Sequence, residues 1–123
     1  MIYHITTRDA WQQALESGIY TPPSLDQQGY IHASTREQVA KVGNAFYRTE
    51  PNCVLLAIDE TRLPTAPVWE PPAHPNPDTP PPTEAQELFP HVYGPIPVGA
   101  VVKIVDFSVG LDGLYSFPAE LEV

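Results

Sequence analysis

Three histidines, a carboxylate and a phenol stand in sequence contexts that could present them to a ligand. His4, His32 and His91 each lie in a short extended or proline-stiffened stretch, and Glu70 and Tyr93 have similar settings. Imidazole exchanges protons near neutral pH, carboxylates stabilise positive charge, and phenols stack and donate hydrogen bonds. These residue types are those of general acid–base catalysis or of polar small-molecule binding.

Each of these side chains also has a purely structural interpretation. His4 or His32 could be buried with both ring nitrogens bonded to backbone or hydroxyl groups. Glu70 could be the exposed end of a strand, and Tyr93 a core aromatic with an anchored hydroxyl. A fourth histidine, His74, lies inside a proline-rich run and is expected to be a solvated loop residue.

Several other chemistries are not indicated. Imidazole and carboxylate suit zinc or iron, but no pair of the candidate ligands has the short spacing of a metal motif, so no metal is predicted. Cys53 is the only cysteine and lies in an apolar run, which predicts an inert buried thiol. The chain has no Gly-x-Ser-x-Gly, no Walker A loop and no Gly-x-Gly-x-x-Gly loop.

The stretch 29–43 is the one around which these residues would be organised. A strand at 30–33 places His32 beside a predicted helix start, because Ser34 and Glu37 have the spacing of a capping box. The first N–H groups of such a helix favour anions. The stretch therefore predicts a ligand-binding position where this strand meets the helix.

An earlier strand is predicted at 2–6, with His4 and Thr6 on one face. Thr6 and Asp9 again have capping-box spacing, and Gly18 would end the helix that follows. Residues 53–58 are apolar throughout, which predicts a strand covered on both faces at the centre of the sheet.

The remaining predictions follow from apolar periodicity and breakers. A second helix would bury Val39, Val42 and Phe46. The prolines of 89–97 predict a stiff extended path that projects His91 and Tyr93 on one side. The other predicted segments are a loop at 25–29, a brief strand at 68–70, a helical turn at 84–88, a strand at 101–109 with Lys103 toward solvent, and a hairpin return at 114–117 after Asp112-Gly113.

Length and composition predict a single domain over residues 1–123. Strands outnumber helices, which predicts an α+β fold with a curved or split, mostly antiparallel sheet and two early helices. Seven of the twelve residues from 71 to 82 are proline, so this segment is expected to be a surface excursion.

The net charge is -9, with 15 acidic residues against six lysines and arginines, and this argues against nucleic acid as a partner. No apolar run approaches the length of about 20 residues that a membrane span needs. The first residues lack the pattern of a secretory signal, so a cytoplasmic location is expected.

Five motifs carry a family resemblance: Tyr3-His4-Ile5-Thr6, Gly29-Tyr30-Ile31-His32-Ala33-Ser34, Leu55-Leu56-Ala57-Ile58-Asp59, Trp69-Glu70 and Phe89-Pro90-His91-Val92-Tyr93-Gly94-Pro95-Ile96. Through them, nearly the whole chain outside the proline-rich excursion resembles the bacterial domain-of-unknown-function family 952, which has no established activity.

The first half is also similar to the RNA 2′-phosphotransferases of the ADP-ribosyltransferase superfamily, which use NAD. Residues 4–6 match a His-Gly-Thr of that family except at the glycine, 32–34 match its His-Leu-Ser, and 42–43 match a Val-Gly. Asn44 and Ala45 stand where the family has a catalytic arginine. With the acidic charge, this argues against RNA phosphate transfer and leaves an NAD-type pocket on an ADP-ribosyltransferase-like fold.

The resemblance implies specific roles in cleaving or transferring from the nicotinamide–ribose bond of NAD. His4 would orient a ribose hydroxyl, Ser34 would hold phosphate, and Glu70 would support the developing cation. The predicted catalytic residues are Glu70, His91 and Tyr93, and the predicted ligand-binding residues are His4, Thr6, Tyr30, His32 and Ser34. The alternatives are a non-catalytic module that binds a nucleotide-like or other small ligand, a protein-interaction module, and an accessory factor acting on another protein.

Overall fold

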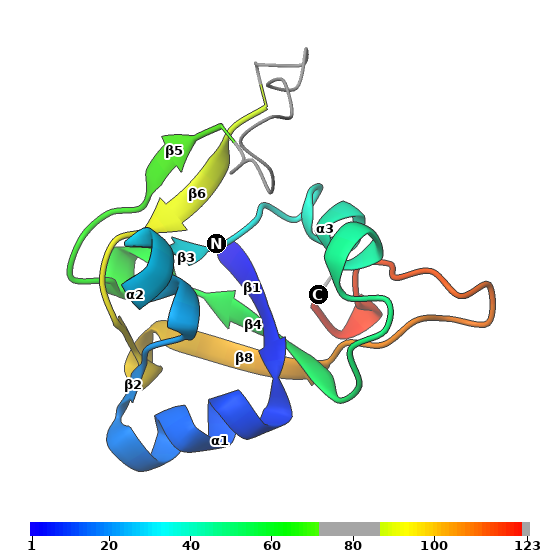
Figure 1. Cartoon of the computed structure of the whole chain (residues 1–123), viewed down its shortest axis with the longest axis horizontal. Coiled ribbons are helices and arrows are strands. Elements are labelled where there is room, and N and C mark those ends of the chain that lie inside the picture. Colours follow the sequence, from blue (N-terminus) through cyan, green and yellow to red (C-terminus); the bar gives the residue numbers. More distant parts are fainter. Residues whose placement is uncertain (72–86, 122–123) are drawn as a thin grey trace.

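The computed structural model describes residues 1–71 and 87–121. Most of the proline-rich excursion, His74 and most of the helical turn predicted at 84–88 lie outside these ranges. At the centre is a three-stranded antiparallel sheet in which β4 (Cys53–Ile58) lies between β1 (Ile2–Thr7) and β8 (Val101–Asp106). Figure 1 shows α1 on one side of this sheet in the view and the β5–β6 pair on the other.

Strand β4 separates two hydrophobic clusters, which confirms the central strand predicted from its uninterrupted apolar run. Val54, Leu56 and Ile58 belong to one cluster, together with Trp11 and Ile31. The alternate β4 residues, from Cys53 to Ala57, belong to the other. Because successive side chains of a strand point to opposite faces, a strand covered on both sides has no polar position.

Helix α1 (Arg8–Ser17) begins one residue later than predicted. Thr7, not Thr6, is the cap, and its hydroxyl oxygen accepts a hydrogen bond from the Ala10 N–H at 3.2 Å. Thr6 is still in β1 and faces the interior. The helix ends at Gly18, as predicted, in the left-handed region with φ of 88°.

Helix α2 (Pro23–Gln28) replaces the loop predicted at 25–29. Pro23 occupies the first helical position, where its missing N–H removes no hydrogen bond. Gly29 ends the helix with φ of 87°, and its N–H donates to the Leu25 carbonyl at 3.0 Å. The prediction was wrong because it treated the two prolines only as helix breakers.

Helix α3 (Val39–Phe46) begins later than the predicted Ser34–Glu37 capping box. Instead, the Gln38 side chain accepts a hydrogen bond from the Thr35 N–H at 3.0 Å and donates to the Leu88 carbonyl at 2.8 Å. The predicted buried position of Phe46 is also wrong, since that side chain is 68% exposed.

The face that α3 buries is instead centred on Val39 and Gly43. A Cβ at Gly43 would lie 3.0 Å from ring atoms of both Phe107 and Tyr115. The helix therefore presents its glycine to the aromatic rings, which need this close approach.

Two smaller antiparallel sheets complete the fold and confirm a split α+β arrangement. The first has the order β3 (Ile31–His32), β6 (Phe89–Val92), β5 (Val68–Glu70), and the second pairs β2 (Ile19–Tyr20) with β7 (Ile96–Pro97). Short 3-10 turns span Glu60–Arg62, Val98–Ala100 and Ala119–Leu121. A backbone bridge between Tyr3 and Ser34 links β1 to the chain that follows β3.

The C-terminal part differs from the predicted hairpin. Strand β8 ends at Asp106, not at 109, although Lys103 is exposed as predicted. Residues 114–117 form no strand, and the Tyr115 ring instead stacks on Phe107 with centroids 4.4 Å apart. Aromatic packing thus holds the returning segment in place of a strand ladder.

Candidate functional site

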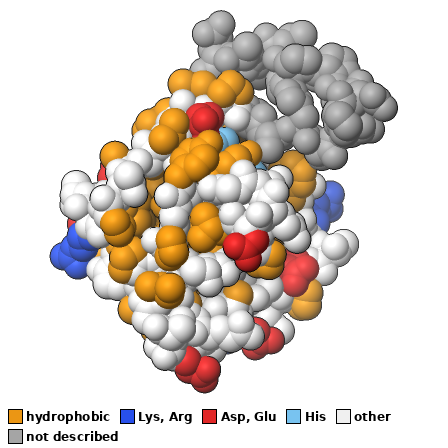
Figure 2. All heavy atoms as spheres, turned by 60° about the vertical axis from the view of Figure 1, so that its left-hand side comes forward, with side chains coloured by type: hydrophobic (Ala, Val, Ile, Leu, Met, Phe, Trp, Pro, Cys, Tyr) orange, Lys and Arg blue, Asp and Glu red, His pale blue; other side chains and the backbone are white. Residues whose placement is uncertain are grey.

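Five side chains from β3, β5, β6 and their ends form one cluster, here called the β3–β5–β6 site: Tyr30, His32, Glu70, His91 and Tyr93. The strand register explains it, because His32 and Val68 both lie opposite His91. Residues two apart share a face of a strand, so Glu70 and Tyr93 join the same side. Ile31 and Val92 point the other way, into the core. Figure 2 shows histidine atoms reaching the surface among hydrophobic and acidic side chains.

The Glu70 carboxylate holds the His91 ring in one orientation. His91 is 2% exposed, and its Nδ1 lies 2.8 Å from Glu70 Oε1. Because a carboxylate accepts, Nδ1 carries the hydrogen, which leaves a lone pair on Nε2 of the neutral ring. Among the described residues Nε2 has no hydrogen-bond partner, and every fully buried side-chain nitrogen or oxygen has one. Nε2 is therefore a hydrogen-bond acceptor that none of the described residues occupies.

Tyr93 donates a second hydrogen bond to the same oxygen of Glu70, at 2.6 Å. This bond, followed by the bond from His91, lowers the pKa of Glu70, and the bond to Glu70 raises the pKa of Tyr93 to about 12. Near neutral pH the pair is thus a carboxylate and a neutral phenol. Both bonds use Oε1, Oε2 accepts none from the described residues, and the Glu70 side chain is 34% exposed.

Tyr30 packs against every aromatic ring of the site. Its ring stacks on His91 with centroids 4.1 Å apart and an interplanar angle of 15°. Its ring centroid lies 4.9 Å from that of His32 in an edge arrangement and 5.3 Å from that of Tyr93. The Tyr93 side chain is 44% exposed, so one phenol ring borders solvent. The rings form a rigid platform beside the Glu70 carboxylate.

His32 is held by Gln28, a residue that the sequence-based reasoning did not single out. The His32 Nε2 and Gln28 Oε1 are hydrogen-bonded, so Nε2 donates and the neutral ring keeps a lone pair on Nδ1. Burial, and then the electrostatic interaction with His91, lowers the pKa of His32. Gln28 lies in α2, so recognising Pro23 and Gly29 as helix ends would have placed Gln28 in the last turn, four residues before His32.

His4 and Thr6 lie in a separate buried network. The His4 Nδ1 donates to the His32 carbonyl, and its Nε2 lies 2.7 Å from the Tyr20 hydroxyl. Because Nε2 of the neutral ring accepts the Tyr20 proton, the Thr6 hydroxyl, 2.8 Å from the Tyr20 oxygen, donates to that oxygen. Burial lowers the pKa of His4 to about 4, so the ring is neutral.

Ser34 is buried as well, and its backbone N–H and carbonyl bond with the backbone of Tyr3 at 2.7 and 2.8 Å. The structure therefore does not bring His4, Thr6 or Ser34 into the cluster with Glu70 and His91. Among the described residues, His4 connects to the β3–β5–β6 site through its hydrogen bond to the His32 carbonyl.

Residues 5–104 match the family model described as "Protein of unknown function (DUF952)". The chain belongs to this family. The matched range includes β3, β5 and β6 and all five residues of the site. The search of curated proteins finds no match.

Solved structures of the protein CC0527 from Caulobacter crescentus are similar to this DUF952 chain. A crystal structure has 27% identity and a TM-score of 0.79 and covers 99% of this chain and 98% of that one. A crystal structure of a double mutant gives 27% and 0.78 with the same coverage. A solution structure gives 29% and 0.70 over 92% and 89% of the two chains. The chain thus shares its α+β fold with CC0527, and the ADP-ribosyltransferase-like assignment stays a prediction.

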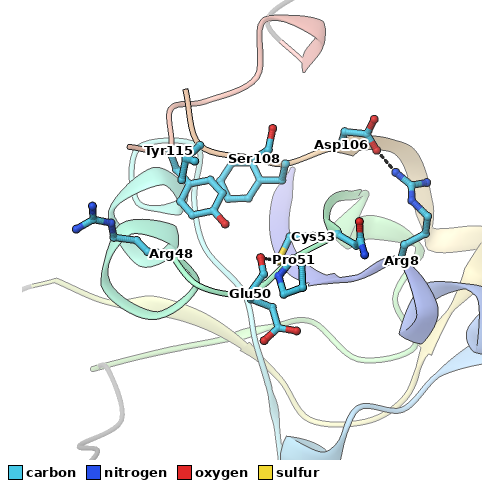
Figure 3. A pocket seen from close by; sticks show the side chains of 11 residues that line it. Arg8, Arg48, Glu50, Pro51, Cys53, Asp106, Ser108 and Tyr115 are labelled. Carbon is cyan, nitrogen blue, oxygen red and sulfur yellow. Dashed lines mark hydrogen bonds and ion pairs between the residues drawn. The ribbon is translucent and has the colours of Figure 1, made fainter. Parts of the chain in front are cut away.

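A cavity of about 420 Å³ lies elsewhere in the DUF952 chain, and none of the five site residues lines it. Arg8 forms an ion pair with Asp106 across one edge, and Glu50 lies near the middle (Figure 3). Cys53 also lines it, but the thiol donates to the Glu50 carbonyl at 3.6 Å, and burial raises its pKa. Charges of both signs and a protonated thiol give this cavity no evident reactive group.

Among the described residues, no three histidine, cysteine, aspartate or glutamate side chains are grouped as ligands for a metal ion. None of the described helices is long and apolar enough to cross a bilayer.

Proposed function

We propose that the β3–β5–β6 site binds a nucleotide-like ligand and cleaves the bond between nicotinamide and ribose, with NAD as the first ligand to test. One observation carries this proposal: a carboxylate with an open oxygen lies beside an exposed phenol ring and a histidine whose Nε2 is unpartnered among the described residues. A charged oxygen, a stacking surface and a base are the groups that this reaction needs.

Each residue has a defined role in the proposed reaction. The C–N bond breaks and nicotinamide leaves with the bonding electron pair, which gives the ribose C1′ oxocarbenium character. Glu70 Oε2 stabilises that positive charge, and Tyr93 and Tyr30 support the nicotinamide ring. Water or an acceptor hydroxyl forms the new C–O bond, and its proton passes to Nε2 of His91.

His4 and Thr6 serve as positioning residues in this proposal. Their hydrogen bonds with Tyr20 join β1 to β2, and His4 also fixes the backbone carbonyl of His32. The sequence-based expectation of direct ribose contact by His4 is therefore replaced by an indirect effect on the His32 side chain. Ser34 is a positioning residue as well, because its backbone forms hydrogen bonds with the backbone of Tyr3.

A second candidate is binding without turnover. Glu70 Oε1 already accepts two hydrogen bonds, which delocalises part of the charge that bond cleavage would draw upon. A site of this kind would recognise the nicotinamide nucleoside through stacking and one carboxylate oxygen. Its ligand would be released unchanged.

Calorimetric titration of the purified chain with NAD and its nicotinamide nucleosides, followed by chromatographic assay of free nicotinamide, separates these candidates. Heat with nicotinamide release supports the enzyme, and heat without release supports the binding module. If none of these ligands produces heat, the proposed function is wrong.

Two variants test whether any nicotinamide release occurs at the β3–β5–β6 site. Glu70→Gln keeps the size of the side chain and removes its charge, so release should fall at least about a hundredfold. Glu16→Gln removes the same charge from α1, which lies away from β5 and β6 in Figure 1, and should leave release unchanged. Equal rates for the two variants would contradict the role of Glu70.

A further inference from the structure

The charges around the β3–β5–β6 site favour a cationic ligand over an anionic one. The chain carries a net charge of -9, and the ionised group at the centre of the site is the Glu70 carboxylate. The six basic residues take up other positions: Arg8 pairs with Asp106, Lys41 with Glu87 and Arg62 with Asp59, Lys103 bonds the Glu120 carbonyl, Arg36 lies over Phe117, and Arg48 lines the separate cavity.

A dinucleotide such as NAD brings two phosphates, and an enclosed phosphate needs cationic side chains or several aligned N–H groups. Within the described residues, no lysine or arginine makes a hydrogen bond or ion pair with Tyr30, Glu70 or Tyr93. Ser34, the residue predicted to hold phosphate, is buried with its backbone N–H donating to Tyr3. The phosphates would therefore approach the Glu70 carboxylate without a lysine or arginine partner.

The nicotinamide end of the ligand has the opposite character. An N-ribosylated nicotinamide ring is a pyridinium cation, and cations are attracted to the faces of tyrosine rings and to carboxylates. Tyr93 offers an exposed ring whose hydroxyl donates a hydrogen bond to Glu70. The Tyr30 ring lies beside it, with the two centroids 5.3 Å apart. The exposed phenol ring and the carboxylate of the site thus match the cationic ring.

We infer that the ligand class of this site is a phosphate-free N-ribosylpyridinium nucleoside, of which nicotinamide riboside is the simplest member. This inference rests on the proposed function and narrows it, since the same C–N bond is bound or broken. The positive ring lies against Tyr93 and Tyr30, and Glu70 Oε2 faces the ribose. Phosphate groups weaken binding because they add negative charge beside Glu70.

The test compares ligands that share the ribose and the carboxamide and differ in charge. Calorimetry on the full chain at low salt uses nicotinamide riboside, its mononucleotide, NAD, and the uncharged dihydro form of the riboside. The riboside should bind tightest. The two phosphate-bearing ligands should bind about tenfold more weakly, and the dihydro riboside about fivefold to tenfold more weakly because it lacks the cation.

Two independent measurements check the cause of this order. Glu70→Gln should bring the four affinities within about threefold of one another, whereas Glu16→Gln should leave the order unchanged. Circular dichroism verifies that both variants are folded. In the unaltered chain, 1 M salt should weaken riboside binding and narrow the difference from NAD, because the Debye length falls to about 3 Å.

The outcomes separate a failure of the charge inference from a failure of the proposed function. If NAD or the mononucleotide binds at least as tightly as the riboside, the charge inference is overturned and the proposed function stands. If the dihydro riboside equals the riboside, the cation contributes nothing and the inference is likewise wrong. Absence of heat with all four ligands removes the proposed function, and the inference with it.

Discussion

At the scale of single residues, the site depends on one carboxylate oxygen that accepts two hydrogen bonds. Tyr93 and His91 both donate to Glu70 Oε1, at 2.6 and 2.8 Å. An acceptor shared in this way favours the ionised carboxylate, while the phenol and the imidazole are each fixed in one orientation. Glu70 is the residue through which the other two are positioned.

Removing the Tyr93 hydroxyl should therefore be visible at Glu70. In Tyr93→Phe the largest cause of the lowered Glu70 pKa is lost, so this pKa should rise toward its ordinary value. A titration of the carboxyl carbon by NMR measures the change. Tyr47→Phe is a matched control that removes a phenol outside the site. A Glu70 pKa that is the same in both variants would contradict the shared-oxygen arrangement.

The buried His4 should make folding stability depend on pH. Its ring stays neutral in the folded chain down to a pKa of about 4, whereas the unfolded chain takes up this proton near pH 6.5. The His4 contribution is therefore fully present above pH 6.5 and is lost as the pH falls toward 4. Between pH 7 and pH 5 we expect a loss of about 2 kcal/mol in the free energy of unfolding.

Urea unfolding at the two pH values measures this loss, and NMR titration of the imidazole assigns it. The His4 ring should show no titration until the pH approaches 4. His4→Gln should reduce the pH dependence even if it lowers stability at pH 7. A His4 ring that titrates near 6.5 would show that it is solvated and not enclosed by Tyr20 and β3.

The sequence predicted correctly which side chains project to the same side where prolines or strand alternation fix the backbone. Prolines and period-two spacing indicated that His91 and Tyr93 project together, and both reach Glu70. The pattern also placed His4 and Thr6 on one face of their strand. It could not show that Tyr20 covers that face, because such a contact depends on how β2 and β1 meet in space.

At the scale of elements, helix and strand ends carry the differences between prediction and structure. The capping signals were misplaced at Thr6 and Ser34, since Thr7 caps α1 and Gln38 precedes α3. Thr6 and Thr7 are both of a residue type that caps helices, and the burial of Thr6 in β1 leaves Thr7 as the cap. The core strand β4 was predictable because every position of an uninterrupted apolar run is compatible with burial.

Helix α2 should depend on the left-handed glycine that ends it. Gly29 has φ of 87°, where a Cβ is strained, although nothing lies within 4 Å of that position. Gly29→Ala should therefore lower the free energy of unfolding by about 1 kcal/mol. Gly99 also has open space around it but no positive φ, so Gly99→Ala is the matched control. Equal denaturant midpoints for the two variants would contradict the conformational argument.

At the scale of the whole molecule, the two clusters that flank β4 support different parts of the chain. The cluster on one face includes Ile31 and Val92, which lie directly behind the β3–β5–β6 site. The cluster on the other face includes Val39 from α3 and Phe107 from the C-terminal part. Because β4 belongs to both, global unfolding should be cooperative, while local opening should differ between the two sides.

Adjacent leucines in β4 provide a matched pair to test this division. Leu55 and Leu56 are each 0% exposed but point into opposite clusters. Leu55→Ala and Leu56→Ala should each lower the free energy of unfolding by about 2 to 5 kcal/mol, through lost burial and the cavity left behind. Leu111→Ala removes the same atoms from a fully exposed side chain and should change stability little.

Hydrogen exchange of backbone amides should then separate the two core variants. Leu56→Ala removes packing from the cluster behind β3 and β6, so protection should fall most at the amides of Ile31 and Val92. Leu55→Ala should instead reduce protection in α3 and at Phe107. Ligand affinity should follow the same division and weaken more in Leu56→Ala, because the strands that carry His32 and His91 lose their support. Identical exchange patterns in the two variants would show that either substitution loosens both hydrophobic clusters. The site would then not be supported by one cluster alone.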